Sequence, residues 1–411
     1  MRSSSLLLAA ALLAAPAQAQ EVDRDALRDA ADTLLQRAVD ELGIPGVVAM
    51  AVDADGVLYE GAFGARAPDG PAMSTDTVMD IASMTKPIAA IAVMQLVEEG
   101  RVELDAPASD YAPEIGELKV LDGWEGDAPV LREPARPLTM RHLLTHTAGM
   151  GYGIWSDDTQ RYGEAEGIPS VSSGDPKALM GALMSDPGEA WLYGTSMDWA
   201  SRIVEEVTGQ SFGAYVEEHI LGPLGMEDTG FLITPGMREH LAVVYQRDEG
   251  GAFAATDRER RQDPPVESGG GGLYSTAEDY IRVVRLFLND GTLDGATLLE
   301  PGTVEAMGEN AMGEVRVVPL ETNAPGFTAD LEMFPDVEKS WGLSFMINEA
   351  TAPTGRAAGS LAWAGINNTF FWIDPETGVG GVVMTQTLPF LDPDVRDVYL
   401  AFEAAVYDAL R

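Results

Sequence analysis

The stretches of this chain that favour β-strands lie near its two ends, and a long region that lacks them lies between. Near the start, the β-rich residues 47–52 and 57–63 flank Asp-Ala-Asp-Gly at residues 53–56, which is typical of a hairpin turn. The strands expected near the other end are residues 341–347, 360–364, 369–373 and 379–385. We therefore predict one antiparallel sheet built from both ends of the chain.

Helical patterns surround these strands and fill the region between them. The expected helices are residues 23–42, 83–99, 139–144, 197–208, 211–219, 276–289 and 395–410. The pattern predicts an α/β (α+β) fold in which residues 20–105 and 270–411 form a sheet domain flanked by helices. Residues 106–269 are expected to form a mainly helical inserted lobe. The glycine run at residues 269–272 is expected to be a flexible boundary loop.

The first residues have the features of an export signal. Arg2 supplies a positive start, residues 6–15 are apolar, and Ala17-Gln18-Ala19 has the small-x-small form of a cleavage site. Residues 1–19 are therefore predicted to be a signal peptide. The protein is expected to be exported, periplasmic or secreted, and to keep no stable membrane anchor after cleavage. The absence of cysteine excludes disulfides, thiol catalysis and thiolate metal ligands.

The net charge of the chain limits the classes of partner that it can bind. The formal net charge is −40, and such a chain repels phosphate backbones and anionic membrane surfaces. A nucleic-acid partner is therefore not expected, and a small-molecule substrate is. The sequence makes no prediction about the oligomeric state.

A Ser-x-x-Lys pair formed by Ser83 and Lys86 indicates a candidate catalytic site. The chain has only four lysines, and Lys86 alone has a serine three residues before it. At the start of a helix this spacing places both side chains on one face, with the hydroxyl near the positive end of the helix. Apolar residues follow Lys86, and burial would favour its neutral amine. The pair can therefore activate a serine nucleophile without histidine.

Histidine-based and metal-based chemistry fit less well. No Gly-x-Ser-x-Gly elbow occurs in the chain, which argues against an α/β-hydrolase. His142 and His146 are four residues apart, but Leu143 stands where a zinc-protease helix carries glutamate. We expect neither a metal site nor a cofactor.

Several stretches together resemble a known superfamily. They are residues 79–86, 143–149, 187–193, 269–276 and 363–365, and they span most of the chain. They resemble the serine β-lactamase and penicillin-binding-protein superfamily, whose nucleophile lies in a Ser-x-x-Lys motif. Within it the chain is most similar to the class C β-lactamase branch and to family VIII carboxylesterases. The resemblance implies a β-lactamase-like fold.

The resemblance also implies roles for individual residues. Ser83 would be the acylated nucleophile, Lys86 its partner base, and Tyr193 a general base and proton shuttle. A phenol near an ammonium would favour its ionised form, which suits that task. Trp363-Ala364-Gly365 falls where the superfamily has Lys-Thr-Gly, on a strand facing the nucleophile. The N–H groups of Ser83 and Ile366 would form the oxyanion hole.

Two departures from the lactamase pattern bear on the substrate. Thr195 stands where the Tyr-x-Asn motif has asparagine, and Trp363 stands where a lactamase has lysine. A lysine would help to hold a substrate carboxylate, which an indole cannot do. Together with Ala364 and Gly365, these residues are expected to contact the substrate and to favour an apolar ester.

The leading hypothesis is therefore a carboxylesterase that cleaves short-chain esters through an acyl-enzyme. The alternatives left open are a β-lactamase or D-alanyl-D-alanine peptidase, an amide hydrolase or acyltransferase, and a non-catalytic binding protein on the same fold. The sequence does not decide whether Lys86 or Tyr193 takes the proton in each step.

Overall fold

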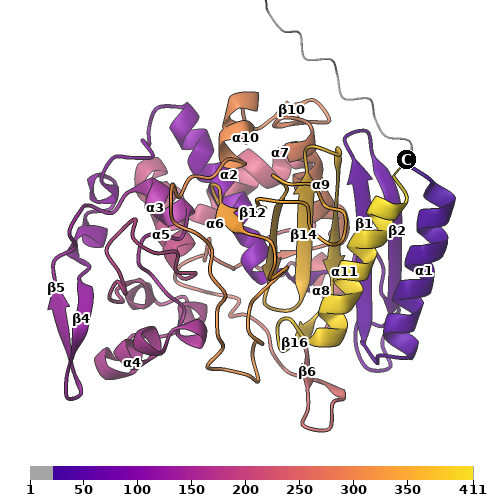
Figure 1. Ribbon diagram of the computed structural model, residues 1–411, viewed down its shortest axis with the longest axis horizontal. Helices are drawn as coiled ribbons and strands as arrows, with labels where there is room; N and C mark the ends of the chain where they lie inside the picture. The colour runs from indigo at the N-terminus through magenta and orange to yellow at the C-terminus, as the bar shows by residue number, and fades with distance from the viewer. Residues whose placement is uncertain (1–21, 411) are drawn as a thin grey trace, which may run out of the picture.

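The computed structural model describes residues 22–410, so the predicted signal peptide lies outside the described residues. Within that range, no helix is long and apolar enough to cross a membrane. The centre of the molecule is a seven-stranded sheet in the order β11-β12-β13-β14-β15-β1-β2, with every neighbouring pair antiparallel (Figure 1). Its strands are β1 (Gly46–Asp53), β2 (Val57–Gly64), β11 (Lys339–Trp341), β12 (Met346–Asn348), β13 (Leu361–Gly365), β14 (Thr369–Asp374) and β15 (Val379–Met384).

The two ends of the chain meet between β1 and β15. Val48 pairs with Met384 at one end of this ladder, and Asp53 pairs with Val379 at the other. The prediction of one antiparallel sheet built from both ends is therefore confirmed, as is the mixed α/β fold.

Helices cover both faces of the sheet, and side-chain alternation along β14 assigns them. Phe370 and Trp372 point to α11 (Pro393–Asp408), where their rings meet Tyr399. Phe371 points to the other face and contacts Tyr280 of α9 (Ala277–Leu288). Successive residues of a strand face opposite sides, so one strand contributes to two buried layers. The helix α1 (Arg24–Asp40) lies beside α11 (Figure 1).

One predicted strand was wrong. Residues 341–347 were expected to form a single strand, but they include a turn between β11 and β12. The N–H of Gly342 donates to the carbonyl of Phe345 at 2.8 Å, and Ser344 has φ of +82°. A Cβ on Gly342 would collide with the carbonyl oxygen of Met307. The turn is buried and mostly apolar, so it carries none of the polar residues that signal a surface hairpin.

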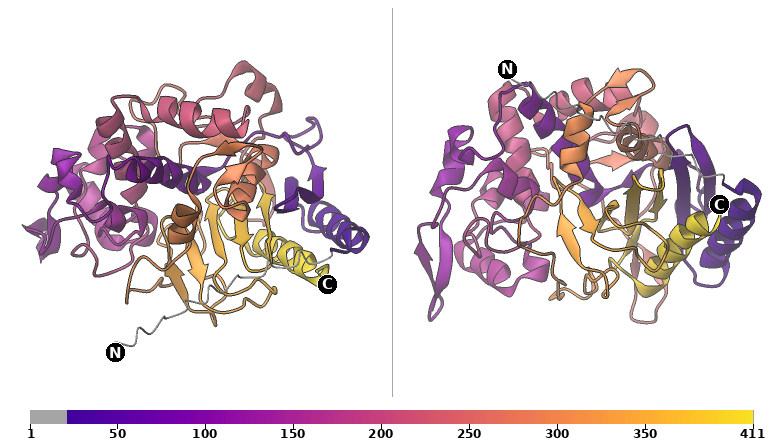
Figure 2. Two further views of the ribbon diagram at one scale, coloured as in Figure 1. Left: turned by 90° about the horizontal axis from the view of Figure 1, so that it is seen from above. Right: turned by 45° about the horizontal axis from the view of Figure 1, so that its top comes forward.

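Residues 106–269, which were predicted to form the helical lobe, contain the helices α3 (Met140–Leu144), α4 (Asp157–Glu166), α5 (Ser196–Thr208), α6 (Phe212–Val216), α7 (Gly222–Leu224) and α8 (Pro235–His240). The part of residues 106–269 that carries α3, α4 and α5 lies on the other side of the molecule from α1 and α11 (Figures 1 and 2). The helix α2 (Thr85–Glu98), which precedes this region in the chain, packs against α5. The lobe also carries a hairpin that the sequence did not predict, formed by β4 (Val120–Glu125) and β5 (Ala128–Arg132). Further short elements are β6 (Tyr245–Arg247), β7 (Phe253–Ala255), β9 (Thr292–Leu293), β10 (Ala296–Thr297), α10 (Pro301–Met307) and β16 (Thr387–Leu388).

Candidate active site

Ser83 is positioned by segments that lie far apart in the sequence. The short strand β3 (Met79–Asp80) pairs with β8 (Tyr274–Ser275), and the N–H of Ile81 donates to the carbonyl of Leu273 at 3.2 Å. The chain then turns sharply at Ala82, whose φ is +45°, a conformation that residues other than glycine rarely adopt. Ser83 follows in a single 3₁₀ turn that leads directly into α2. Such strained positions cluster at functional sites.

Lys86 lies one turn further along, and its side chain is completely buried. Its Nζ is 3.1 Å from Ser83 Oγ, 3.4 Å from Tyr152 Oη and 2.5 Å from the carbonyl oxygen of Gly270. The amine also lies 4.7 Å from the ring centroid of Tyr193. The structure therefore brings Ser83, Lys86 and Tyr193 together, as the sequence predicted.

The surroundings of Lys86 favour its neutral amine. Burial lowers the pKa of Lys86 to about 7, while the charge of Asp198 opposes this shift and that of Arg260 adds to it. A buried ammonium loses its hydration, which disfavours the charged form. A large fraction of the amine is therefore unprotonated near neutral pH and able to accept the Ser83 proton.

Tyr193 is buried beside Lys86, but its expected ionisation is wrong. Burial raises the pKa of the Tyr193 hydroxyl above its ordinary value, and hydrogen bonds with Ser83 and Trp363 oppose this only in part. The prediction relied on a neighbouring ammonium, yet the same burial also favours the neutral form of Lys86. Tyr193 therefore remains protonated near neutral pH.

Trp363 is tied to Tyr193. The indole N–H donates to the Tyr193 hydroxyl at 2.9 Å, and the two rings meet edge to face at 4.8 Å. Both side chains belong to an aromatic cluster around Lys86 that also includes Tyr152, Trp155, Trp191 and Trp341. The indole hydrogen bond therefore orients the Tyr193 phenol.

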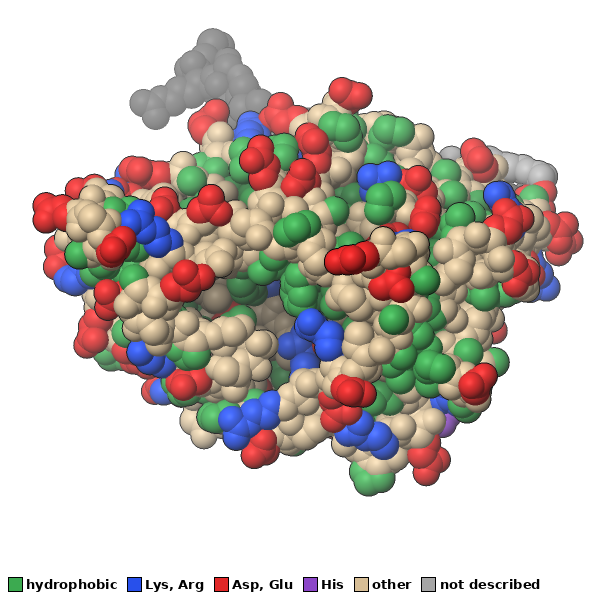
Figure 3. Space-filling view, turned by 90° about the horizontal axis from the view of Figure 1, so that it is seen from below, with side chains coloured by type: hydrophobic (Ala, Val, Ile, Leu, Met, Phe, Trp, Pro, Cys, Tyr) green, Lys and Arg blue, Asp and Glu red, His purple; other side chains and the backbone are tan. Residues whose placement is uncertain are grey.

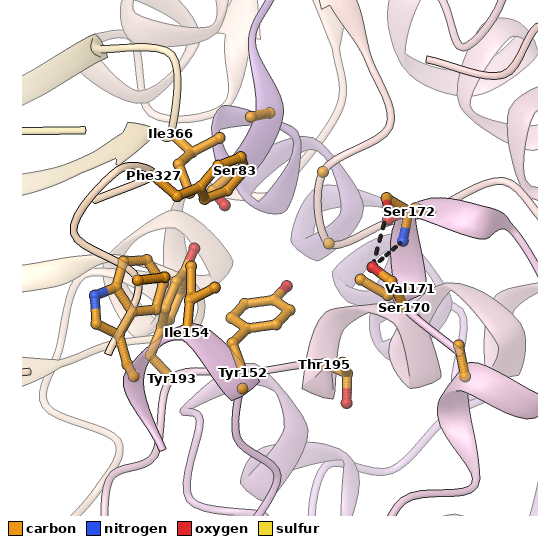
Figure 4. A pocket seen from close by; sticks show the side chains of 18 of the residues that line it. Ser83, Tyr152, Ile154, Ser170, Val171, Ser172, Tyr193, Thr195, Phe327 and Ile366 are labelled. Atoms are coloured by element: carbon orange, nitrogen blue, oxygen red, sulfur yellow. Dashed lines mark hydrogen bonds between the residues drawn. The ribbon is translucent and has the colours of Figure 1, made fainter. Parts of the chain in front are cut away.

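The strand β13 brings the rest of this motif against the Ser83 turn. A Cβ on Gly365 would collide with the carbonyl oxygen of Ile81, so only glycine permits this approach. Ile366 follows at the end of the strand and lies beside Ser83 (Figure 4). Ala364 and Thr195, the N-cap residue of α5, also line the cavity next to Ser83.

The sequence missed three groups around Lys86: Tyr152, Asp198 and the Gly270 carbonyl. Asp198 is 2% exposed, and its Oδ1 accepts from the N–H of Gly270 at 3.2 Å and from the hydroxyl of Ser268. Its Oδ2 has no hydrogen-bond partner among the described residues. Burial raises the pKa of Asp198 against opposing effects of Ser268 and the Lys86 charge. A carboxylate on the apolar face of the predicted helix 197–208 was the signal that could have identified it.

The glycine run at residues 269–272 lies beside Ser83, but it is a packed segment rather than the expected flexible loop. A Cβ on Gly269 would lie 2.6 Å from Cβ of Ser201, and one on Gly272 would lie 2.7 Å from the ring of Phe231. A Cβ on Gly270 would collide with the carboxylate of Asp198. Small residues are required because the backbone passes tightly between side chains, with Gly270 holding the Lys86 amine.

A cavity of about 800 Å³ opens in front of Ser83. Figure 3 looks into this hollow, and Lys and Arg side chains lie on its rim. Tyr152 and Tyr193 come from the helical lobe, while Phe327 and Ile366 approach Ser83 from the C-terminal part of the chain (Figure 4). This volume is within the usual range of about 300–1,000 Å³ for small-molecule sites.

The two histidines at residues 142 and 146 do not form a metal site. Nδ1 of His142 accepts from the N–H of Thr139 at 3.1 Å and completes a capping box for α3. His146 is fully buried between the rings of Tyr193 and Trp341. Within residues 22–410, no group of three His, Cys, Asp or Glu side chains could hold a metal ion.

Comparison with known proteins supports this description of the fold and the site. The chain is 31% identical over 395 residues to Monacolin J acid methylbutanoyltransferase of Aspergillus terreus, covering 92% of this chain and 94% of that relative. It is 28% identical over 396 residues to Esterase EstB of Burkholderia gladioli, covering 89% and 92%. The solved structure of unliganded simvastatin synthase (LovD) from Aspergillus terreus superposes with a TM-score of 0.79 at 30% identity, covering 93% of this chain and 98% of that one.

A protein-family model also matches nearly the whole of the described chain. Residues 31–406 match the model named Beta-lactamase. The relatives include acyltransferases and an esterase, so the superfamily comprises serine enzymes that form acyl-enzymes and pass the acyl group to water or another acceptor. This chain belongs to the beta-lactamase family.

Proposed function

We propose that this protein is a serine carboxylesterase that works through an acyl-enzyme on Ser83. One observation carries the proposal: Lys86 Nζ lies 3.1 Å from Ser83 Oγ. The Lys86 side chain is completely buried and has a pKa of about 7. A nucleophile and a base that is partly unprotonated near neutral pH are thus within hydrogen-bond distance, at the wall of a cavity that admits a small molecule.

The reaction uses the groups already described. Ser83 Oγ attacks the ester carbonyl carbon while its proton passes to Lys86 Nζ. The oxyanion accepts hydrogen bonds from the N–H groups of Ser83 and Ile366. The tetrahedral intermediate collapses, the C–O bond to the alcohol breaks, and the protonated Tyr193 hydroxyl gives its proton to the leaving oxygen. Lys86 then restores the Tyr193 proton, and water repeats the sequence to release the acid.

Two features favour esters over lactams. The indole N–H of Trp363 is already used by the Tyr193 hydroxyl, so this position offers no cation to a lactam carboxylate. Thr195 has no amide group with which to bind a substrate side-chain amide, unlike the asparagine of the lactamase motif. An ester with a short acyl chain and a larger alcohol part requires neither contact.

Acyl transfer to an alcohol is the second candidate function. The cavity of about 800 Å³ exceeds the space that a short acyl group and one water require. The remaining space could hold an acceptor alcohol beside the acyl-enzyme. Two relatives with about 30% identity are named as methylbutanoyltransferases, which supports the same possibility.

The test is a panel of 4-nitrophenyl esters, with a chromogenic cephalosporin alongside. We expect ester cleavage to exceed cephalosporin cleavage, and mass spectrometry of the quenched enzyme to find one acyl group on Ser83. Ser83→Ala should abolish both signals, whereas Ser109→Ala, outside the cavity, should retain them. Full ester turnover by Ser83→Ala would disprove the proposal. Added alcohols that divert the acyl group from water would identify the transferase.

A further inference from the structure

Arg258 is a cation at the rim of the catalytic cavity that has no anionic partner among the described residues. It lies on the segment between β7 and the glycine run and contributes to the cavity wall together with Ser83 and Phe327. Its guanidinium forms no ion pair and no hydrogen bond within residues 22–410. Arg24, Arg28, Arg66 and Arg285 also form no ion pair within residues 22–410, but none of these four lines the cavity.

The charged residues that directly follow Arg258 in the sequence form ion pairs with other residues. Arg260 pairs with Asp80 at 2.9 Å, and Arg261 pairs with Asp263 at 2.7 Å. Glu259, which directly follows Arg258 in the sequence, pairs with the guanidinium of Arg238. Asp80 and Glu259 therefore form their ion pairs with other arginines. Burial lowers the pKa of Arg258, although the charge of Asp80 still opposes this shift. Figure 3 shows Lys and Arg side chains gathered at this rim.

A contact with Phe327 holds the Arg258 side chain against the wall of the cavity. Its guanidinium carbon lies 4.7 Å from the ring centroid of Phe327, and this contact fixes the cation against the cavity wall. Phe327 itself lies next to Ser83 and Ile366 (Figure 4). The planar guanidinium keeps its donors free for an incoming carboxylate, which it binds through two parallel hydrogen bonds.

We infer that Arg258 recognises a carboxylate on the substrate, so that the preferred substrates are esters bearing a free carboxylate group. This inference rests on the proposed acyl-enzyme function. The carboxylate can belong to the acyl part or to the alcohol part of the ester. This carboxylate site is not the one that a lactamase forms with the lysine of its Lys-Thr-Gly motif. Trp363 of β13 stands at that motif position in this chain, whereas Arg258 comes from a separate segment.

Matched pairs of esters test the inference. Mono(4-nitrophenyl) adipate is compared with 4-nitrophenyl hexanoate for the acyl side, and 4-acetoxybenzoate with methyl 4-acetoxybenzoate for the alcohol side. The measured quantity is the kcat/KM ratio of the anionic to the neutral ester in each pair. We expect Arg258→Gln to lower this ratio by about 10- to 100-fold in one pair, since a charged hydrogen-bonded contact is lost. Arg258→Lys should retain part of the ratio, and added salt should lower it in the wild type.

Arg28→Gln is the matched control, because Arg28 also forms no ion pair within residues 22–410 but lies on α1, outside the cavity. Its ratios should match those of the wild type. Equal ratios in the wild type and Arg258→Gln for both pairs would overturn the inference while leaving the esterase intact. Failure of the proposed function would appear differently, as an absence of turnover with the neutral esters and no acylation of Ser83.

Discussion

Lys86 is the residue on which the chemistry of the site depends, and two opposing effects set its pKa. Complete burial favours the neutral amine, whereas the buried carboxylate of Asp198 favours the ammonium. Asp198 also binds the N–H of Gly270, whose carbonyl accepts from the Lys86 amine. Asp198 therefore acts on the base through its charge and through the position of the Gly270 peptide.

The pH dependence of catalysis should report the Lys86 pKa that burial and the Asp198 charge set together. With a Lys86 pKa of about 7, kcat/KM is expected to fall about tenfold per pH unit below pH 7, because protonation removes the base. Asp198→Asn keeps a side-chain oxygen for Gly270 but removes the charge that favours the ammonium. The Lys86 pKa should then be lower, and the acidic limb of the profile should move to lower pH.

The control for this shift is Glu205→Gln, on the same helix but away from the cavity, where the carboxylate pairs with Arg202. Its profile should overlap that of the wild type. An acidic limb that stays in place in Asp198→Asn, or moves to higher pH, would contradict the assignment.

At the residue scale, the sequence predicted contacts between residues that are close together in the chain. Ser83 and Lys86 are three residues apart, so their contact follows from helix geometry alone. Tyr193 and Trp363 could be found only through the family resemblance, because 170 residues separate the two partners of their hydrogen bond. Asp198 and Arg258 had no motif to mark them, and their roles depend on which charges the fold leaves nearby.

At the element scale, strands were predictable where side chains alternate and turns are polar. The hairpin of β1 and β2 carries an Asp-Ala-Asp-Gly turn, and its strands were predicted within two residues at each end. The short hairpin of β4 and β5 was missed because half-exposed residues interrupt its pattern. The turn between β11 and β12 was missed because it is buried in an apolar core.

A buried ion pair fastens α11 to the segment between β12 and β13. Arg356 and Glu403 have side-chain exposures of 1% and 0%, and their closest atoms are 3.3 Å apart. The hydroxyl of Tyr399 donates to Glu403 at 2.8 Å, and Thr354 donates to its other oxygen. Removing one member of such a pair leaves the other charge buried without compensation.

We therefore expect Glu403→Gln to lower the free energy of unfolding by about 3–5 kcal/mol. Denaturant unfolding measures this change, and the double variant Arg356→Met/Glu403→Leu should recover much of it because no buried charge remains. Glu41→Gln is the control, since the Arg37–Glu41 pair is 61% and 59% exposed and should contribute less than about 1 kcal/mol. A Glu403→Gln effect no larger than this control would argue against a stabilising role for the pair.

At the scale of the whole molecule, the active site joins parts that are far apart in the chain. The helical lobe supplies Tyr152 and Tyr193, the β3–β8 pairing fixes the Ser83 turn, and β13 closes the site from the sheet. Composition predicted none of this assembly. Composition sets only the charge balance, in which 66 acidic residues outnumber 26 lysines and arginines.

That imbalance determines how the stability should respond to salt. Exposed ion pairs each contribute little, and the 66 carboxylates exceed the 26 lysines and arginines by 40, so the excess negative charges repel one another. Such self-repulsion destabilises the compact state, and salt screens it as the Debye length falls from about 30 Å at 0.01 M to about 3 Å at 1 M. We expect Tm at pH 7 to rise with sodium chloride. Near the isoelectric point of about 4.2 the net charge vanishes, and this dependence should largely disappear. A Tm that falls with salt at pH 7 would show instead that attractive ion pairs outweigh the excess negative charge.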